Sequence, residues 1–118
     1  MKSTINAIKQ KYPNKLIVSI FQPHTFTRTK EFASDLANVL NKIDYAYILD
    51  VYSAREKQED HPDVTSDLII NELEHGENIS NDTWDKLKKH ENSVVIFMSP
   101  KEISVIMNNY KEYLESVN

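Results

Sequence analysis

The sequence predicts a single α/β domain built on a mostly parallel sheet. Apolar runs of strand length at 16–21, 45–51 and 93–98 alternate with segments in which apolar residues recur at helical spacing. Such alternation is typical of parallel strands joined by right-handed crossovers. The 118 residues are close to the commonest domain size and suffice for one hydrophobic core.

A helix, a strand and a second helix are predicted in the first 40 residues. The first helix would be capped by Ser3 or Thr4 and would end at Pro13. A buried strand over 16–21 follows, and a helical pattern then begins at Phe32. The apolar face of this second helix consists of Phe32, Leu36, Val39 and Leu40.

The middle of the chain predicts a strand, a loop and a helix. The aromatic and β-branched run 45–51 is the strand, and the polar run 52–62 is the loop. The helix would be capped by Asp63 or Thr65 and would end at Gly76. Its apolar face consists of Val64, Leu68, Ile69 and Leu73.

The last third predicts a short helix over 81–90, a strand over 93–98 and a final helix. A capping box would start the final helix, with Ser99 as the cap, Pro100 at the first helical position and Glu102 at the third. The buried face of that helix consists of Ile103, Ile106, Met107, Tyr110 and Leu114.

Composition and charge exclude several classes of protein. The net charge of −4 argues against a general nucleic-acid binder, which needs a basic surface. The absence of Cys excludes disulfides and thiolate chemistry. No apolar run is long enough to cross a membrane, and no signal peptide follows Met1. We therefore expect a cytoplasmic protein with neither nucleic-acid nor membrane partners.

The sequence also excludes several kinds of site. Gly76 is the only glycine, so neither a P-loop nor a dinucleotide-binding fingerprint is present. Any ATP phosphates would therefore be held by another domain. The four histidines have no metal-ligand spacing, and no serine lies in a nucleophile elbow. We expect no metal and no hydrolytic triad.

Three loops would open at the carboxyl edge of the sheet, where α/β domains bind ligands. They span 22–29, 52–63 and 99–102, and together they form a net-basic rim that favours a carboxylate or a phosphate. The charged and aromatic residues of this rim are His24, Arg28, Tyr52, Arg55, Glu56, Lys57 and Lys101.

Each of these residues also has a structural interpretation. His24 either contacts a ligand or simply packs beside Pro23. Arg28 in a first helical turn either pairs with Glu31 or helps the helix N-terminus to hold an exogenous anion. The charged run 55–57 is either functional or solvated surface. These alternatives remain open from chemistry alone.

Two segments resemble motifs of the Mur ligase family. Residues 21–29, FQPHTFTRT, resemble F-Q-P-H-x-[YF]-[ST]-R-T, and residues 50–56, DVYSARE, resemble D-[IV]-Y-x-A-R-E. Residues 3–7 and 94–98 also resemble family segments. The resemblance covers essentially the whole chain, but only the third, C-terminal domain of these enzymes.

The resemblance implies a Rossmann-like, three-layer domain over residues 1–118. The N-terminal UDP-sugar domain and the central ATP domain would be absent, so the chain would be a domain cut from a longer ligase or the product of a truncated gene. The family member most similar to it joins L-alanine to UDP-N-acetylmuramate in peptidoglycan synthesis. ATP and Mg would be held mainly by the missing central domain, and the chain alone would be inactive. The alternatives are a related murein peptide ligase and a non-catalytic anion-binding module.

The resemblance also implies a set of substrate-binding residues. In the family, the His and Arg of the Q-P-H segment lie beside the carboxylate of the amino acid, which implies His24 and Arg28 here. Thr25, Tyr52 and Arg55 complete the expected substrate-binding set, with no catalytic residue and no metal ligand. Many family members carry a second Arg where this chain has Thr25. The family's glycines after the last strand are replaced by Ser99 and Lys101.

Overall fold

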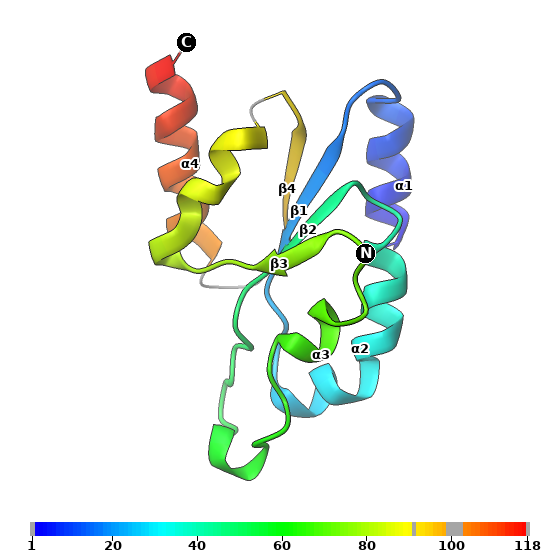
Figure 1. Cartoon of the computed structure of the whole chain (residues 1–118), viewed down its shortest axis with the longest axis vertical. Helices are drawn as coiled ribbons and strands as arrows, with labels where there is room; N and C mark the ends of the chain where they lie inside the picture. The colour runs from blue at the N-terminus through cyan, green and yellow to red at the C-terminus, as the bar shows by residue number, and fades with distance from the viewer. Residues whose placement is uncertain (1, 91, 99–102, 118) are drawn as a thin grey trace.

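The computed structural model describes residues 2–90, 92–98 and 103–117. Four parallel strands form one sheet in the order β3-β2-β1-β4 (Figure 1). They are β1 (Ile17–Phe21), β2 (Tyr45–Ile48), β3 (Gly76–Asn78) and β4 (Val94–Met98). The predicted α/β class and parallel sheet are confirmed.

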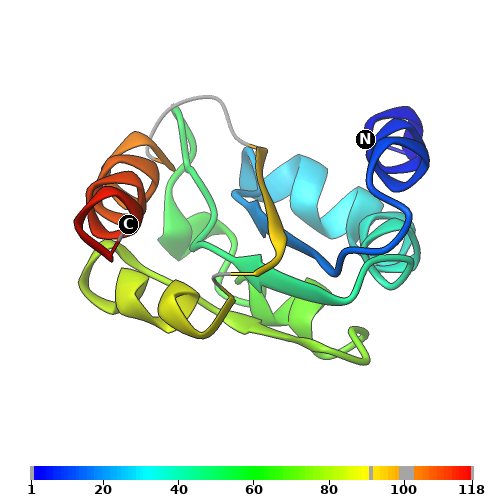
Figure 2. The same ribbon diagram turned by 90° about the horizontal axis from the view of Figure 1, so that it is seen from above.

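Helices cover both faces of the sheet and make three layers (Figures 1 and 2). One face carries α1 (Lys2–Lys11), α2 (Phe26–Leu40) and α3 (Asp67–Ile70). The other carries the 3₁₀ helix η2 (Asn81–His90) and α4 (Ile103–Val117). A further 3₁₀ turn, η1 (Gln58–Asp60), lies in the long loop after β2.

The side chains of β1 alternate between two cores, as the period of a strand requires. Ile17 packs toward α1, α2 and α3, whereas Val18 and Ile20 pack toward η2 and α4. Because both faces are covered, β1 is apolar at nearly every position. Its only buried polar residue is Ser19.

Helix α2 begins at Phe26, six residues before the predicted start at Phe32. Of the predicted apolar face, Leu40 is buried and Leu36 and Val39 pack partly buried against the core, whereas Phe32 is 44% exposed. The residues that α2 buries are Phe26, Thr29, Ala33, Ala37 and Leu40. Two alanines on this face let the helix approach the sheet closely, which a pattern of large apolar residues does not reveal.

The predicted helix ending at Gly76 is much shorter, and Gly76 instead begins the edge strand β3. A Cβ at Gly76 would lie 2.5 Å from Leu73 Cδ1 and 2.8 Å from the Ala46 carbonyl oxygen. The glycine therefore permits close packing of β3 on β2. Ser66 is at the N-cap position of α3 without a side-chain capping bond, whereas the hydroxyl of Thr65, one of the two predicted caps, accepts from Asp67 N at 3.2 Å.

Two predicted caps and one predicted strand end differ from the structure. Ser3 and Thr4 lie inside α1 rather than at its cap. Strand β2 ends at Ile48, three residues before the predicted end, because the chain turns toward the long loop. The predicted capping box over 99–102 lies outside the described residues.

Candidate functional site

The first two predicted rim loops meet at the carboxyl edge of the sheet. Thr25 N donates to the Tyr52 carbonyl at 2.7 Å, and Tyr52 N donates to the Pro23 carbonyl at 2.8 Å. These bonds form an isolated parallel bridge between His24 and Tyr52, beyond the ends of β1 and β2. The loops are therefore held together as a short extension of the sheet. The third predicted loop, 99–102, lies outside the described residues.

His24 lies against the ring of Tyr52 at this bridge. The two rings are stacked, with centroids 5.5 Å apart and planes 25° apart. His24 is partly exposed, so its ring is both held in place and accessible. Beneath them, the buried Gln22 donates to the Asp50 carbonyl at 3.4 Å.

Thr25 makes the sharp turn from β1 into α2. Its φ of 63° and ψ of 148° lie in a region that is almost restricted to glycine, and a β-branched residue is strained there. Its hydroxyl accepts from Arg28 N at 3.2 Å as the helix cap, and its carbonyl accepts from Thr29 Oγ1 at 2.7 Å. Thr25 therefore has a structural role next to both His24 and Arg28.

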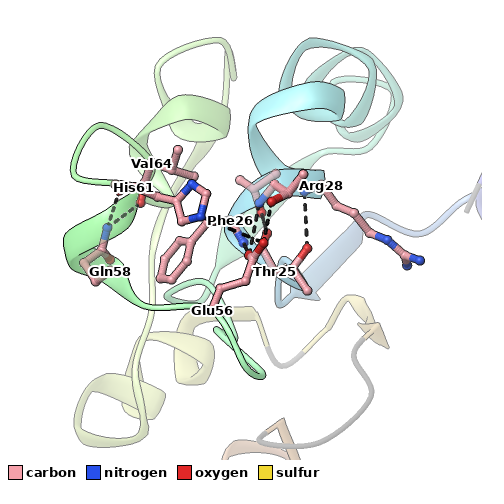
Figure 3. Close-up of polar contacts among 9 residues, drawn as sticks. Thr25, Phe26, Arg28, Glu56, Gln58, His61 and Val64 are labelled. Carbon is pink, nitrogen blue, oxygen red and sulfur yellow. Dashed lines mark hydrogen bonds and ion pairs between the residues drawn. The ribbon is translucent and has the colours of Figure 1, made fainter.

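The carboxylate of Glu56 occupies the N-terminus of α2 (Figure 3). Glu56 Oε1 accepts from Phe26 N at 2.5 Å and from Thr27 N at 3.1 Å, and Thr27 Oγ1 donates to Oε2. The hydrogen bond from the Thr27 hydroxyl has the largest effect on Glu56 and lowers the pKa of its carboxyl group. The bonds from the two amides lower this pKa further, against the opposing effect of desolvation. The amides that seemed open to an exogenous anion are filled from within the chain.

Glu56 also belongs to a well-packed loop. Gln58 Nε2 donates to the carbonyls of His61 and Val64 at 2.7 and 3.0 Å. The His61 ring stacks on Phe26 with centroids 5.5 Å apart, and its Nε2 lies 3.9 Å from Glu56 Oε2. The loop is thus fixed against the start of α2 from two directions.

Arg28 extends away from Glu56 (Figure 3) and borders a pocket of about 200 Å³. The ion pairs found among the described residues do not include Arg28, so the alternative of pairing with Glu31 is not observed there. The pocket combines the Arg28 cation and the His24 ring with an apolar floor. Its lining residues are Phe21, Pro23, His24, Arg28, Thr29, Phe32 and Leu36.

The structure separates the predicted rim residues into groups. His24 and Arg28 share the pocket, while Tyr52 supports His24 from behind. Arg55 is exposed and follows Ala54, whose φ is 56°, and it does not line this pocket. Within the described residues, no group of three or more His, Cys, Asp and Glu side chains is placed to hold a metal ion. No described helix is long and apolar enough to cross a membrane.

Two features of the site were missed from the sequence. The first is the capping role of Glu56, which was placed in a charged run although it ends the family-like DVYSARE segment. The second is the contribution of Phe32 and Leu36, which were assigned only to the apolar face of the helix; both line the pocket, and Leu36 also packs against the core. A helix that starts at Phe26 places Phe32 one turn after Arg28, and Leu36 two turns after it, on the same side of the helix.

The chain is similar to curated ligases over nearly its whole length. No family model matches the chain. The UDP-N-acetylmuramate–L-alanine ligase of Lactobacillus johnsonii is 39% identical over 115 residues, covering 97% of this chain and 26% of that protein. The Lactobacillus acidophilus ligase of the same name is 38% identical with the same coverage. The chain spans about a quarter of the length of these relatives.

A solved structure shares the fold. The UDP-N-acetylmuramate–alanine ligase of Thermotoga maritima superimposes with a TM-score of 0.67 and 20% sequence identity. The match covers 99% of this chain and 24% of that one. The curated matches lie in the C-terminal part of the relatives. The chain therefore belongs to the Mur ligase family, as a homologue of the C-terminal part of the UDP-N-acetylmuramate–L-alanine ligases.

Proposed function

We propose that this chain is the amino-acid-positioning domain of an ATP-dependent ligase that joins L-alanine to UDP-N-acetylmuramate in the cytoplasm, during peptidoglycan synthesis. The observation that carries the proposal is the pocket shared by His24 and Arg28 at the carboxyl edge of the sheet. It lies in the segment that resembles the family motif, in a chain 39% identical to a ligase of that name.

The chemistry of the pocket suits a small amino acid. The guanidinium of Arg28 can bind a carboxylate through two parallel hydrogen bonds, and His24 offers a ring N–H as a further donor. The apolar floor of Phe32 and Leu36 suits a short aliphatic side chain. A substrate held by its carboxylate and its methyl group leaves its amine as the free, directed end.

That directed amine is what amide formation requires. ATP and Mg, held mainly by the other domains, would activate the muramate carboxyl group as an acyl phosphate. The amine then attacks the acyl carbon, the C–N bond forms, and phosphate leaves. The contribution of this chain is the orientation of the amine, which is worth several kcal/mol when the reactants are aligned. Closure of the domain would also exclude water.

A chimera tests this proposal. Residues 1–118 would replace the homologous C-terminal quarter of the Lactobacillus johnsonii ligase. We expect the chimera to form UDP-N-acetylmuramoyl-L-alanine and ADP when given ATP, Mg and both substrates, and the chain alone to form none. Turnover with a recycled peptide but not with L-alanine would favour a murein peptide ligase. A folded chimera that binds ATP and the UDP-sugar without any turnover would favour a non-catalytic module.

A further inference from the structure

We propose that Glu56 is a positioning residue for the amino acid. Its carboxylate acts as a resident anion at the N-terminus of α2, which fixes Arg28 at the pocket and keeps the substrate carboxylate off the backbone amides. The part of this inference that concerns the substrate rests on the function proposed above. The part that concerns the helix N-terminus does not.

The contacts of Glu56 are those of a bound anion. It takes two consecutive backbone amides and one hydroxyl, all within the first two residues of α2. Its side chain is 25% exposed, so three quarters of it are shielded by the loop and by the ring of His61. A free helix N-terminus attracts anions through its unpaired N–H groups and its dipole. Glu56 is part of the chain, and its carboxylate already occupies these N–H groups and the positive end of the dipole.

The position of Arg28 depends on this arrangement. Arg28 immediately follows Phe26 and Thr27, the two residues whose amides Glu56 binds. Just before them in the chain, Thr25 N donates to the Tyr52 carbonyl. The three residues that directly precede Arg28 are therefore tied to the same loop, Thr25 by Tyr52 and both Phe26 and Thr27 by Glu56. The loss of Glu56 would release one tie and leave the other.

Glu56 also decides which donors the substrate can use. Without it, a substrate carboxylate would have two competing sites, the amides of Phe26 and Thr27 and the side chain of Arg28. These sites lie in different directions, because Arg28 extends away from Glu56 (Figure 3). A carboxylate on the amides would carry the amine of the amino acid away from its attacking position. With Glu56 in place, only the pocket is available.

The first arm of the test uses the 118-residue chain and follows amide hydrogen exchange by NMR. In Glu56→Ala we expect the amides of Phe26 and Thr27 to exchange at least tenfold faster than in the wild type. Added formate, a small carboxylate, should restore their protection saturably, whereas chloride at equal ionic strength should not. Glu59→Ala, which removes an exposed carboxylate three residues away, should change neither amide. Glu56→Ser, whose shorter side chain lacks this carboxylate, is the second variant if Glu56→Ala does not fold.

The second arm measures steady-state kinetics in the chimera. Glu56→Ala should raise the KM for L-alanine about fivefold and leave kcat and the KM for ATP within twofold, since it frees the amides of Phe26 and Thr27 as a competing site for the substrate carboxylate. Glu59→Ala should change none of these values.

The two arms separate the two proposals. Two results would refute the claim that Glu56 acts as a resident anion. One is unchanged amide exchange at Phe26 and Thr27 in a folded Glu56 variant, and the other is lost protection that formate does not restore. An unchanged KM for L-alanine in an active Glu56→Ala chimera would overturn the positioning role. An inactive wild-type chimera would instead count against the proposed function, while the exchange result would stand.

Discussion

Thr25 allows a sharp test of how the turn into α2 is built. With φ at 63° and ψ at 148°, it has a conformation in which a side chain is strained, yet the chain places a β-branched residue there. Its hydroxyl compensates in part by capping Arg28 N. Thr25→Gly removes the strain and the cap together, whereas Thr25→Ala removes the cap and keeps most of the strain.

The magnitudes decide the sign of each change. Backbone strain of this kind costs roughly 1–3 kcal/mol. A glycine at the N-cap costs only a few tenths of a kcal/mol relative to threonine, and its greater freedom in the unfolded chain costs about 0.5–1 kcal/mol. Thr25→Gly should therefore be stabilising by roughly 1 kcal/mol. Thr25→Ala should be destabilising by about 1 kcal/mol through the lost cap.

Urea unfolding followed by circular dichroism measures both variants. We expect the glycine variant to exceed the alanine variant by about 2 kcal/mol in its free energy of unfolding. The m value should stay unchanged, because the surface exposed on unfolding is the same. A glycine variant no more stable than the alanine variant would show that the turn at Thr25 is not strained, and the explanation of this cap would be refuted.

Three further predictions follow from other parts of the molecule. Gly76→Ala should lower the free energy of unfolding by roughly 1–3 kcal/mol through overpacking against Leu73 and the Ala46 carbonyl, and urea unfolding at wild-type stability would contradict that packing. Because the pKa of Glu56 is lowered in the folded state, its charge should stabilise the fold fully above the ordinary glutamate pKa and lose that effect as the pH falls through the lowered value. Unfolding of the wild type and of Glu56→Gln across this range should therefore converge at acid pH, and a constant difference would argue against the charged cap. The chain alone should not bind ATP at micromolar concentrations in calorimetry, since its single glycine and lack of a P-loop lysine provide no phosphate cradle.

Strands β1 and β4 were predictable because their apolar runs are continuous. Both contribute side chains to the cores on the two faces of the sheet, although β4 is an edge strand, so almost every residue is apolar and such runs stand out in a sequence. The edge strand β3 was not predictable, because Gly76, Glu77 and Asn78 carry no apolar period. Its place is set by tertiary contacts, such as the bond from Asn78 Nδ2 to the Ile48 carbonyl at 3.0 Å.

The start of α2 was hidden for a different reason. Residues 25–29 contain three threonines, which favour strands and caps over helix interiors, so the helical pattern emerged only at Phe32. The true start is capped locally by the Thr25 hydroxyl and also by Glu56, which is 30 residues from Phe26 in the sequence. The cap that Glu56 supplies from a distant loop leaves no local signature, unlike a capping box within one turn.

The same limit applies to the candidate site. The approach of His24 and Tyr52 followed from the parallel order of β1 and β2, because successive parallel strands end at one edge. The pocket floor did not follow, because it depended on where α2 begins. Residue types and topology therefore indicated the polar rim, whereas its apolar complement required the three-dimensional structure.

The central claim is that Arg28 holds the carboxylate of the amino acid, and kinetics of Arg28→Ala in the chimera test it most directly. Loss of a charge-assisted hydrogen bond costs roughly 1.5–3 kcal/mol, so the KM for L-alanine should rise about 10- to 150-fold. The KM for ATP should stay within twofold, and Lys57→Ala, which removes an exposed cation from the neighbouring loop, should change neither value. An equal rise in both KM values, or an unchanged KM for L-alanine, would contradict the claim and make Arg28 a structural residue.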